Sequence, residues 1–382
     1  MGKSNIVIKE VKSKKEVRLF ATYPLKLYKG CPYYVPSLRA DEMATFNPKK
    51  NFSLKHSITK GFLAYKNGEL VGRIAGFISL PSNEMRNEKF IRFSRLECID
   101  DIEVFKALLG AVEKFGKEHG MEYIHGPWGF NDQDREGMLT YGFDKRSTYA
   151  TNYYYPYFAK NIESLGFSDE SKWVEKQFAI PTEPYERIVN IADKLKEKHN
   201  VRELLDTLTI KDIVKQYGDK VYNAINDAYG HLDNYVPVDE LTWNNLLSSF
   251  AIILNPKFCS FLVDENDEIA AFGVVFPSIC KALIDHKGKL FPTGFISLIK
   301  SIKKPKELEM ALIGVTNKYK NSGINSIVIS RIMSNVVKEG ITHIESNPML
   351  ETNLNIQNQW KFAETTIIKK RQTYKKEIGS LI

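Results

Sequence analysis

The sequence lacks the features that mark a secreted or metal-binding protein. Its 382 residues include only four cysteines, none of them in a Cys-x-x-Cys pair and none near histidine at metal-ligand spacing. Isolated cysteines predict free, buried thiols in a reducing compartment rather than a disulfide framework. The seven histidines form no His-Glu-x-x-His pattern, so we expect no metal site. The four cysteines are Cys31, Cys98, Cys259 and Cys280.

Long apolar runs and basic tracts are also missing. No segment approaches the roughly 18 apolar residues that span a bilayer, and the N-terminus lacks the apolar core of a signal peptide. We therefore expect a cytoplasmic protein with no membrane span. The net charge of +8 favours an anionic partner such as coenzyme A, nucleic acid or an acidic lipid surface. The lysine clusters at 300–306 and 369–376 are typical of solvated surface, so nucleic acid is not the expected partner.

What the sequence does contain is a strand, a glycine turn and a helix between residues 307 and 340. Apolar residues 310–315 predict a buried strand, and a polar turn then leads into Ser322 and Gly323. From there apolar residues recur at helical spacing until Gly340, which is typical of a helix end. The free N–H groups at the start of such a helix can hold a phosphate. An ordinary turn in which Gly323 relieves strain is the alternative.

The two halves of the chain repeat one pattern. Tyr-Val-Pro occurs at 34–36 and again at 235–237, and a predicted hairpin at 61–79 has a counterpart at 258–278. The second half is expected to begin with a strand at 201–208, and residues 279–306 are expected to form a long loop. Because each half holds a full set of strands and helices, we predict two domains, residues 1–180 and 181–382.

The second half, read as hairpin, strand, glycine turn, helix, strand, helix, strand, resembles the GNAT (Gcn5-related N-acetyltransferase) fold. Two further stretches, GPWGFNDQDREGMLTYGFD from residue 126 and NYYYPYF from residue 152, resemble a subgroup of tandem GNAT-like bacterial proteins with no settled activity. The resemblance implies an α+β fold with a mixed α/β sheet, built from two tandem acyl-CoA N-acyltransferase (GNAT) domains. The first half has Asp100 and Asp101 where the turn would be, so it is expected not to bind coenzyme A in the usual way.

In GNAT proteins the glycine turn grips the pyrophosphate of coenzyme A, and the preceding strand pairs with the pantetheine arm. By this resemblance the second half would bind acetyl-CoA or another acyl-CoA. The family turn reads Gln/Arg-x-x-Gly-x-Gly/Ala. Here Lys320 keeps a cation, Gly323 fits, and Asn325 replaces a residue that is normally tiny. The implied cofactor-binding residues are Ile313, Gly314, Val315, Lys320, Ser322, Gly323, Ile324, Asn325 and Ser326.

Acyl transfer from a thioester to an amine requires that the amine lose a proton and that the departing thiolate gain one. The family often uses a tyrosine as the acid, but the nearest equivalent here is Trp360, which cannot donate an acidic proton. Glu309 and Glu345 are candidate bases, with ordinary strand-end charges as the alternative.

An aromatic-rich region predicts either a substrate cleft or an inter-domain core. Its candidate cleft residues are Trp128, Asn131, Tyr141, Asn152, Tyr153 and Tyr155.

These features predict an acyl-CoA-dependent N-acyltransferase, with acetyl transfer as the first expectation, acting on an unknown small-molecule or peptide amine. Two alternatives stay open. The degenerate turn and the absent tyrosine favour a binding protein that has kept the fold without the activity. The duplicated fold and the positive charge permit transfer from an aminoacyl-tRNA. The acceptor, the acyl chain length and the oligomeric state cannot be read from the sequence.

Overall fold

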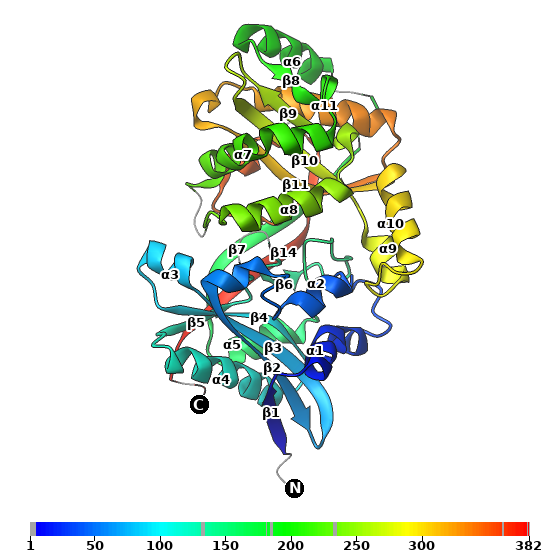
Figure 1. Ribbon diagram of the computed structural model, residues 1–382. Coiled ribbons are helices and arrows are strands. Elements are labelled where there is room, and N and C mark those ends of the chain that lie inside the picture. The colour runs from blue at the N-terminus through cyan, green and yellow to red at the C-terminus, as the bar shows by residue number, and fades with distance from the viewer. Residues whose placement is uncertain are drawn as a thin grey trace.

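One mixed β-sheet runs through both halves of the chain, and helices cover both of its faces (Figure 1). The computed structural model describes residues 5–130, 134–180, 182–183, 186–231, 235–360, 363–379 and 381. None of the helices described there combines the length and the apolar character that crossing a bilayer requires. The predicted α+β class with a mixed sheet is confirmed.

The first half folds as its local sequence signals predict. Ser13 and Glu16 form a capping box at the start of the first helix. Asn67 and Gly68 both have positive φ (51° and 83°), which produces a tight hairpin turn. The strands are β1 (Ile6–Glu10), β2 (Ser57–Lys66), β3 (Glu69–Ser79), β4 (Phe90–Cys98), β5 (Tyr123–Gly126), β6 (Met138–Tyr141) and β7 (Ser168–Phe178). The helices are α1 (Lys14–Leu27), α2 (Arg39–Ala44), α3 (Leu80–Arg86), α4 (Ile102–Glu118) and α5 (Tyr157–Ser164).

The second half repeats this topology, which supports the predicted internal repeat. Its first four strands pair antiparallel in sequence order and the fifth joins the fourth in parallel, as in the first half. The strands are β8 (Arg202–Glu203), β9 (Cys259–Val263), β10 (Ile269–Pro277), β11 (Glu307–Val315), β12 (His343–Glu345), β13 (Met349–Leu350) and β14 (Thr365–Glu377). The helices are α6 (Glu186–His199), α7 (Ile210–Tyr229), α8 (Glu240–Ile253), α9 (Cys280–Asp285), α10 (Gly294–Lys303), α11 (Asn325–Lys338) and α12 (Leu354–Asn358).

The halves are joined by an exchange of long strands. The order along the sheet is β1-β2-β3-β4-β5-β14-β7-β12-β11-β10-β9-β8. The last strand of the chain, β14, therefore lies between β5 and β7, and β7 in turn pairs with β12 of the second half. Figure 1 shows these two strands, green and red, crossing from one half to the other. Neither half completes its sheet with its own strands alone.

Each half has a helix layer on both faces of the sheet. In the first half, α4 packs its apolar stripe against one face, and Phe20 of α1 packs with Phe77 on the other. In the second half, α11 and α7 cover opposite faces and bury separate clusters, represented by Val328 and Ile225. Close packing requires glycine at one point: a Cβ on Gly273 would lie 2.4 Å from Val328 Cγ1.

Two local predictions are wrong. The strand expected at 201–208 is only the two-residue β8, because a 3-10 helix, Leu204–Asp206, follows it at once, with Glu203 accepting a hydrogen bond from the Leu205 N–H group. The loop expected at 279–306 contains the helices α9 and α10. Its apolar residues Ile279, Leu283 and Leu298 are buried with Val35, which the linear sequence does not reveal.

The exchanged strands predict that neither half is stable alone. Residues 1–180 produced without the rest would leave β5 and β7 without the strand that pairs with both, exposing two sheet edges. We expect this fragment to show no cooperative thermal transition by circular dichroism. Co-expression with residues 181–382 is the control and should restore one shared transition. A fragment 1–180 that melts cooperatively near the full-length temperature would show instead that the predicted domains fold independently.

Candidate functional site

Strands β11 and β12 diverge and leave a fork in the sheet of the second half. They pair only from Glu307 to Glu309 of β11, whereas β11 continues along β10 as far as Val315. The register between β10 and β11 passes from Met310 to Leu312 without a partner for Ala311, which marks a bulge. A bulge beside a fork turns backbone groups of β11 away from the ladder. These groups face the fork, which is the side from which an extended ligand would approach the strand.

A tyrosine that the sequence did not single out occupies the backbone of this strand. The hydroxyl of Tyr229, the last residue of α7, donates to the Ile313 carbonyl at 2.8 Å and accepts from the Ile313 N–H at 3.1 Å. Burial raises the pKa of Tyr229 to about 12, and the backbone hydrogen bond from Ile313 opposes this rise only in part. The hydroxyl therefore keeps its proton at neutral pH and is positioned to donate it.

The predicted glycine turn lies at the start of α11. Gly323 has φ +81°, a conformation that favours glycine, and the helix has no side-chain cap at its first turn. The N–H groups of Ser326 and Ile327 bond back to Gly323 and Ile324. Lys320 is exposed beside the turn, and among the described residues no carboxylate lies within ion-pair distance of it. The turn thus combines a helix N-terminus with a free cation, an arrangement that suits a phosphate.

The matching region of the first half is filled by its own charges. Arg73 donates to Glu42 at 2.7 Å and to Glu97 at 2.5 Å, and Arg95 lies 3.3 Å from Glu42. Burial by itself would raise the pKa of Glu42, but the two arginines lower it to about 2. At the helix start, Asp101 caps α4 by accepting from the Glu103 N–H group. The carboxylate of Asp101 therefore occupies the helix start at which an anion would bind in the first half.

A cavity of about 770 Å³ connects the two halves. From the second half it is lined by the bulged part of β11, by Tyr229 and by apolar residues of α8 and α11. From the first half it is lined by polar groups, among them Asp41, Asp134 and Arg135. Partial desolvation and the negative charge of Glu42 raise the pKa of Asp41, whose exposed carboxylate has no partner among the described residues. The cavity therefore has a more apolar end towards α8 and α11 and a more polar end towards the first half.

The candidate cleft residues divide between this cavity and the core. Trp128 and Asn152 line the cavity. Tyr153 and Tyr155 pack in the core of the first half, where the Tyr153 hydroxyl donates to the Phe143 carbonyl at 3.0 Å. Tyr141 is 55% exposed on β6. Asn131 lies outside the described residues.

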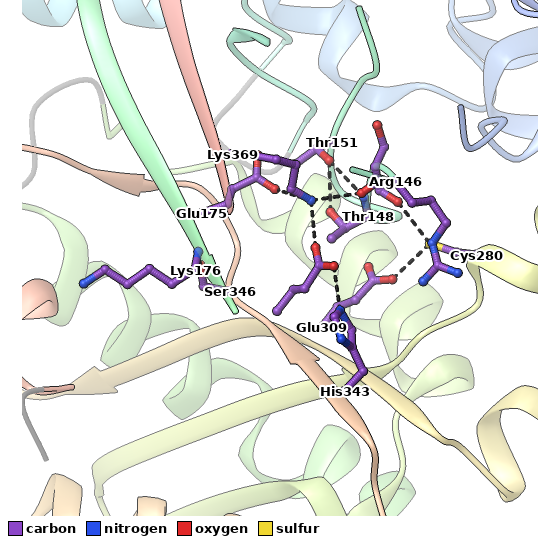
Figure 2. A network of polar contacts seen from close by, with 12 residues as sticks. Arg146, Thr148, Thr151, Glu175, Lys176, Cys280, Glu309, His343, Ser346 and Lys369 are labelled. Atoms are coloured by element: carbon purple, nitrogen blue, oxygen red, sulfur yellow. Dashed lines mark hydrogen bonds and ion pairs between the residues drawn. The ribbon is translucent and has the colours of Figure 1, made fainter. Parts of the chain in front are cut away.

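A buried network of charges lies where the exchanged strands meet β12 (Figure 2). Lys369 of β14 is fully buried and lies 2.9 Å from Glu175 of β7 and 2.7 Å from Glu345 of β12. Burial alone would lower the pKa of Lys369, but the two carboxylates raise it. Arg371 also bonds to Glu175 and donates to the Asn152 carbonyl at 2.6 Å. Three strands from different parts of the chain thus share one set of ion pairs.

The two candidate bases belong to this region and have other partners. Glu345 bonds to His343 at 2.7 Å and to Lys369. Glu309 accepts hydrogen bonds from the Ser278 hydroxyl at 2.6 Å, from the Tyr149 N–H at 2.8 Å and from the Cys280 thiol at 3.0 Å. Burial raises the pKa of Glu309. Neither carboxylate lines the cavity, and the contact with Tyr149 ties the polar end of the cavity to the start of β11.

The cysteines form no disulfide and no metal cluster among the described residues. All four cysteines are free, three of them buried and Cys31 half-buried. In the part of the chain that the structure describes, no three residues of the types histidine, cysteine, aspartate and glutamate gather as a metal site would require.

The arrangement of the two halves is that of tandem GNAT proteins. A tandem GNAT protein from the clavulanic acid biosynthesis pathway, solved without acetyl-CoA, matches with a TM-score of 0.54 and 10% identity over 99% of both chains. The predicted fold of two tandem GNAT domains is thereby confirmed.

Two bacterial proteins are similar in sequence. Protein YghO of Escherichia coli K12 is 25% identical over 382 residues, which cover 96% of this chain and 94% of YghO. A bacterial ceramide synthase of Caulobacter vibrioides is 26% identical over 320 residues, which cover 82% of this chain and 81% of that protein. No model of a known protein family matches the chain.

The charge network predicts an acid-sensitive contribution from Glu345. Burial by itself would raise the pKa of this carboxyl, but the hydrogen bond from His343 and the charge of Lys369 lower it from 4.5 to about 2. The ionised form therefore stabilises the fold above pH 4.5, and this contribution is lost as the pH falls towards 2. We expect Glu345→Gln to cost about 3 kcal/mol in urea unfolding at pH 7. The difference from the wild type should shrink as the pH falls through that window.

The matched control is Glu351→Gln, which changes an exposed carboxylate at the limit of ion-pair distance from Lys370. It should alter stability by less than about 0.5 kcal/mol at any pH. A Glu345→Gln difference that stays constant from pH 7 to pH 2 would contradict the proposed ion pairing.

Proposed function

We propose that this protein transfers an acyl group from an acyl-CoA thioester to an amine. The observation that carries the proposal is the fork between β11 and β12, where the bulged strand β11 lines a cavity shared by both halves. In the reaction the amine nitrogen forms a bond to the thioester carbonyl carbon, the C–S bond breaks, and the thiolate takes up a proton.

The cofactor would bind along β11 and at the turn before α11. Its pyrophosphate would lie against residues 320–326, where Lys320 supplies a positive charge and Gly323 lets the backbone approach. The pantetheine arm would extend along residues 313–315. Coenzyme A would supply the activated acyl group as a thioester, and the chain would supply its orientation and the proton transfers.

Tyr229 is the residue we propose as the acid for the departing thiolate. Its hydroxyl already lies on the backbone of Ile313, and its raised pKa keeps it protonated. It would replace the tyrosine that the family usually carries at the position of Trp360. Asp41, at the polar end of the cavity, would bind the ammonium group of the acceptor and accept its proton. We prefer Asp41 to Glu309 and Glu345, since neither of these lines the cavity.

The acceptor or the acyl group would carry a hydrocarbon chain. A second, smaller apolar cavity beneath α8 shares Leu246, Phe250 and Leu312 with the main one and extends its apolar end. The similarity to a bacterial ceramide synthase also supports a substrate with a hydrocarbon chain, because a ceramide is an amide of a long-chain amine. Acetyl transfer would leave this apolar volume unused.

The first test is acyl-CoA binding, measured as a shift in melting temperature. Acetyl-CoA and palmitoyl-CoA should both raise the melting temperature in a saturable way. A ligand at 100 times its Kd adds about 2.7 kcal/mol of stability. Lys320→Glu should abolish the shift, because it places a negative charge beside the pyrophosphate. Lys338→Glu, the same change at the far end of α11, should keep the shift. No shift with any acyl-CoA would overturn the proposal and leave the aminoacyl-tRNA alternative to be tested by salt-dependent tRNA retention.

The second test is acyl transfer from palmitoyl-CoA to long-chain amines, followed by thiol release. Tyr229→Phe removes the proposed acid and should lower kcat about 100-fold without changing the acyl-CoA melting shift. Tyr222→Phe is the control, since it removes another hydroxyl of α7 that donates to a backbone carbonyl, that of Val238 at 2.7 Å. In the same assay Asp41→Asn should raise the KM of the amine and lower kcat, because Asp41 is the proposed partner and base of the acceptor.

An equal loss of activity in Tyr229→Phe and Tyr222→Phe would contradict the acid role of Tyr229. Saturable acyl-CoA binding without transfer to any amine would favour the alternative of a binding protein that has kept the fold.

A further inference from the structure

The segment between β10 and β11 presents an apolar surface to solvent. Phe291 is 79% exposed and Ile296 is 69% exposed, and the Phe295 ring lies parallel to that of Phe291 with centroids 6.2 Å apart. Phe295 and Ile296 lie in the first turn of α10, whereas Leu298 of the same helix is buried in the core. The outer face of α10 is therefore apolar at its start, where a surface helix is normally polar. Figure 1 shows α9 and α10, in yellow, at the side of the molecule where the two halves meet.

Lysines surround this apolar surface. Residues 279–306 contain seven lysines and a single acidic residue, Asp285, which pairs with Lys281 at 2.9 Å. Six of the lysines have no carboxylate within ion-pair distance among the described residues, and all six are exposed. These are Lys287, Lys289, Lys300, Lys303, Lys304 and Lys306. Exposed aromatic and aliphatic side chains framed by unpaired cations match the interface of an anionic lipid bilayer.

The opposite side of the same segment borders the cavity. Ile279, Leu290 and Leu298 line the cavity from within the segment. The segment is held in place by the first half, since the Arg39 N–H donates to the Gly288 carbonyl at 2.8 Å. The apolar outer surface and the cavity are thus separated by the thickness of one short helix and its preceding loop.

We propose that residues 281–304 dock the protein on the surface of an anionic lipid bilayer. Phe291, Phe295 and Ile296 enter the interface, and the unpaired lysines contact the anionic headgroups. Docking holds the cavity close to the bilayer, from which a substrate with a hydrocarbon chain can be taken. The docking itself does not depend on the proposed acyltransferase activity, because it is measured without substrate.

The test is flotation of the full-length protein with vesicles. The protein should float with vesicles of phosphatidylcholine and phosphatidylglycerol, should float far less with phosphatidylcholine alone, and should be released by high salt. Phe291→Ser with Ile296→Ser should lower the bound-to-free ratio about tenfold or more. Lys300→Gln with Lys303→Gln should lower it by a similar factor. All four side chains are exposed, so we expect these variants to remain folded. Their melting temperatures and their shifts with acyl-CoA test that expectation.

Matched controls make the same changes elsewhere. Leu80→Ser with Met85→Ser alters two exposed apolar side chains on α3, and Lys106→Gln with Lys114→Gln removes two charges from α4. Both should float as the wild type does. The proposal is overturned if the wild type does not float, or if the controls lose binding as much as the segment variants. It is also overturned if light scattering shows a dimer that the Phe291 and Ile296 changes abolish, since the surface would then belong to a second copy. Loss of vesicle binding with an intact acyl-CoA shift would leave the proposed function untouched.

Discussion

The structure depends on the ion pair between Lys369 and Glu175, which is sealed inside a sheet that both halves share. Lys369 belongs to the last strand of the chain and Glu175 to the last strand of the first half, so the pair forms only when the strands have exchanged. Burying a charge is costly unless it is paired, and here Glu345 adds a second carboxylate from β12. The pairing therefore fixes the register of β14, β7 and β12 together. β12 is the strand that diverges from β11 at the fork, so the same ion pairs lie beside the candidate site.

The two halves use the same topology for different purposes. The first half carries the ion-paired residues Arg73, Glu42 and Glu97 on β3, α2 and β4, and its helix start is capped by Asp101. The second half leaves the fork open and begins its helix with Gly323 and without a side-chain cap. The two halves thus share one topology and differ in the charges placed on it, and only the second half keeps a glycine turn with an exposed cation, Lys320, beside it.

Much of the fold could be predicted because its signals are local. The Ser13–Glu16 capping box, the Asn67-Gly68 turn and the periodicity of α4 and α11 depend only on neighbouring residues. The family resemblance added the order of the strands and the place of the glycine turn. The helices α9 and α10 were missed because their packing partner, Val35, lies in the other half. The shortened β8 was missed because Glu203 bends the chain locally.

The sequence by itself determined the class of fold, the repeat and the turn at Gly323, since each follows from periodicity, turn chemistry or a local motif. Only the tertiary structure decided which strands complete each sheet, because strand exchange costs no change in local conformation. It also brought Tyr229 onto the backbone of Ile313, 84 residues away along the chain. Asp41 of the first half likewise lines the same cavity as β11 of the second half only in the folded chain. Contacts between distant residues leave no periodic trace in a sequence, and the side chains of the candidate site meet through such contacts.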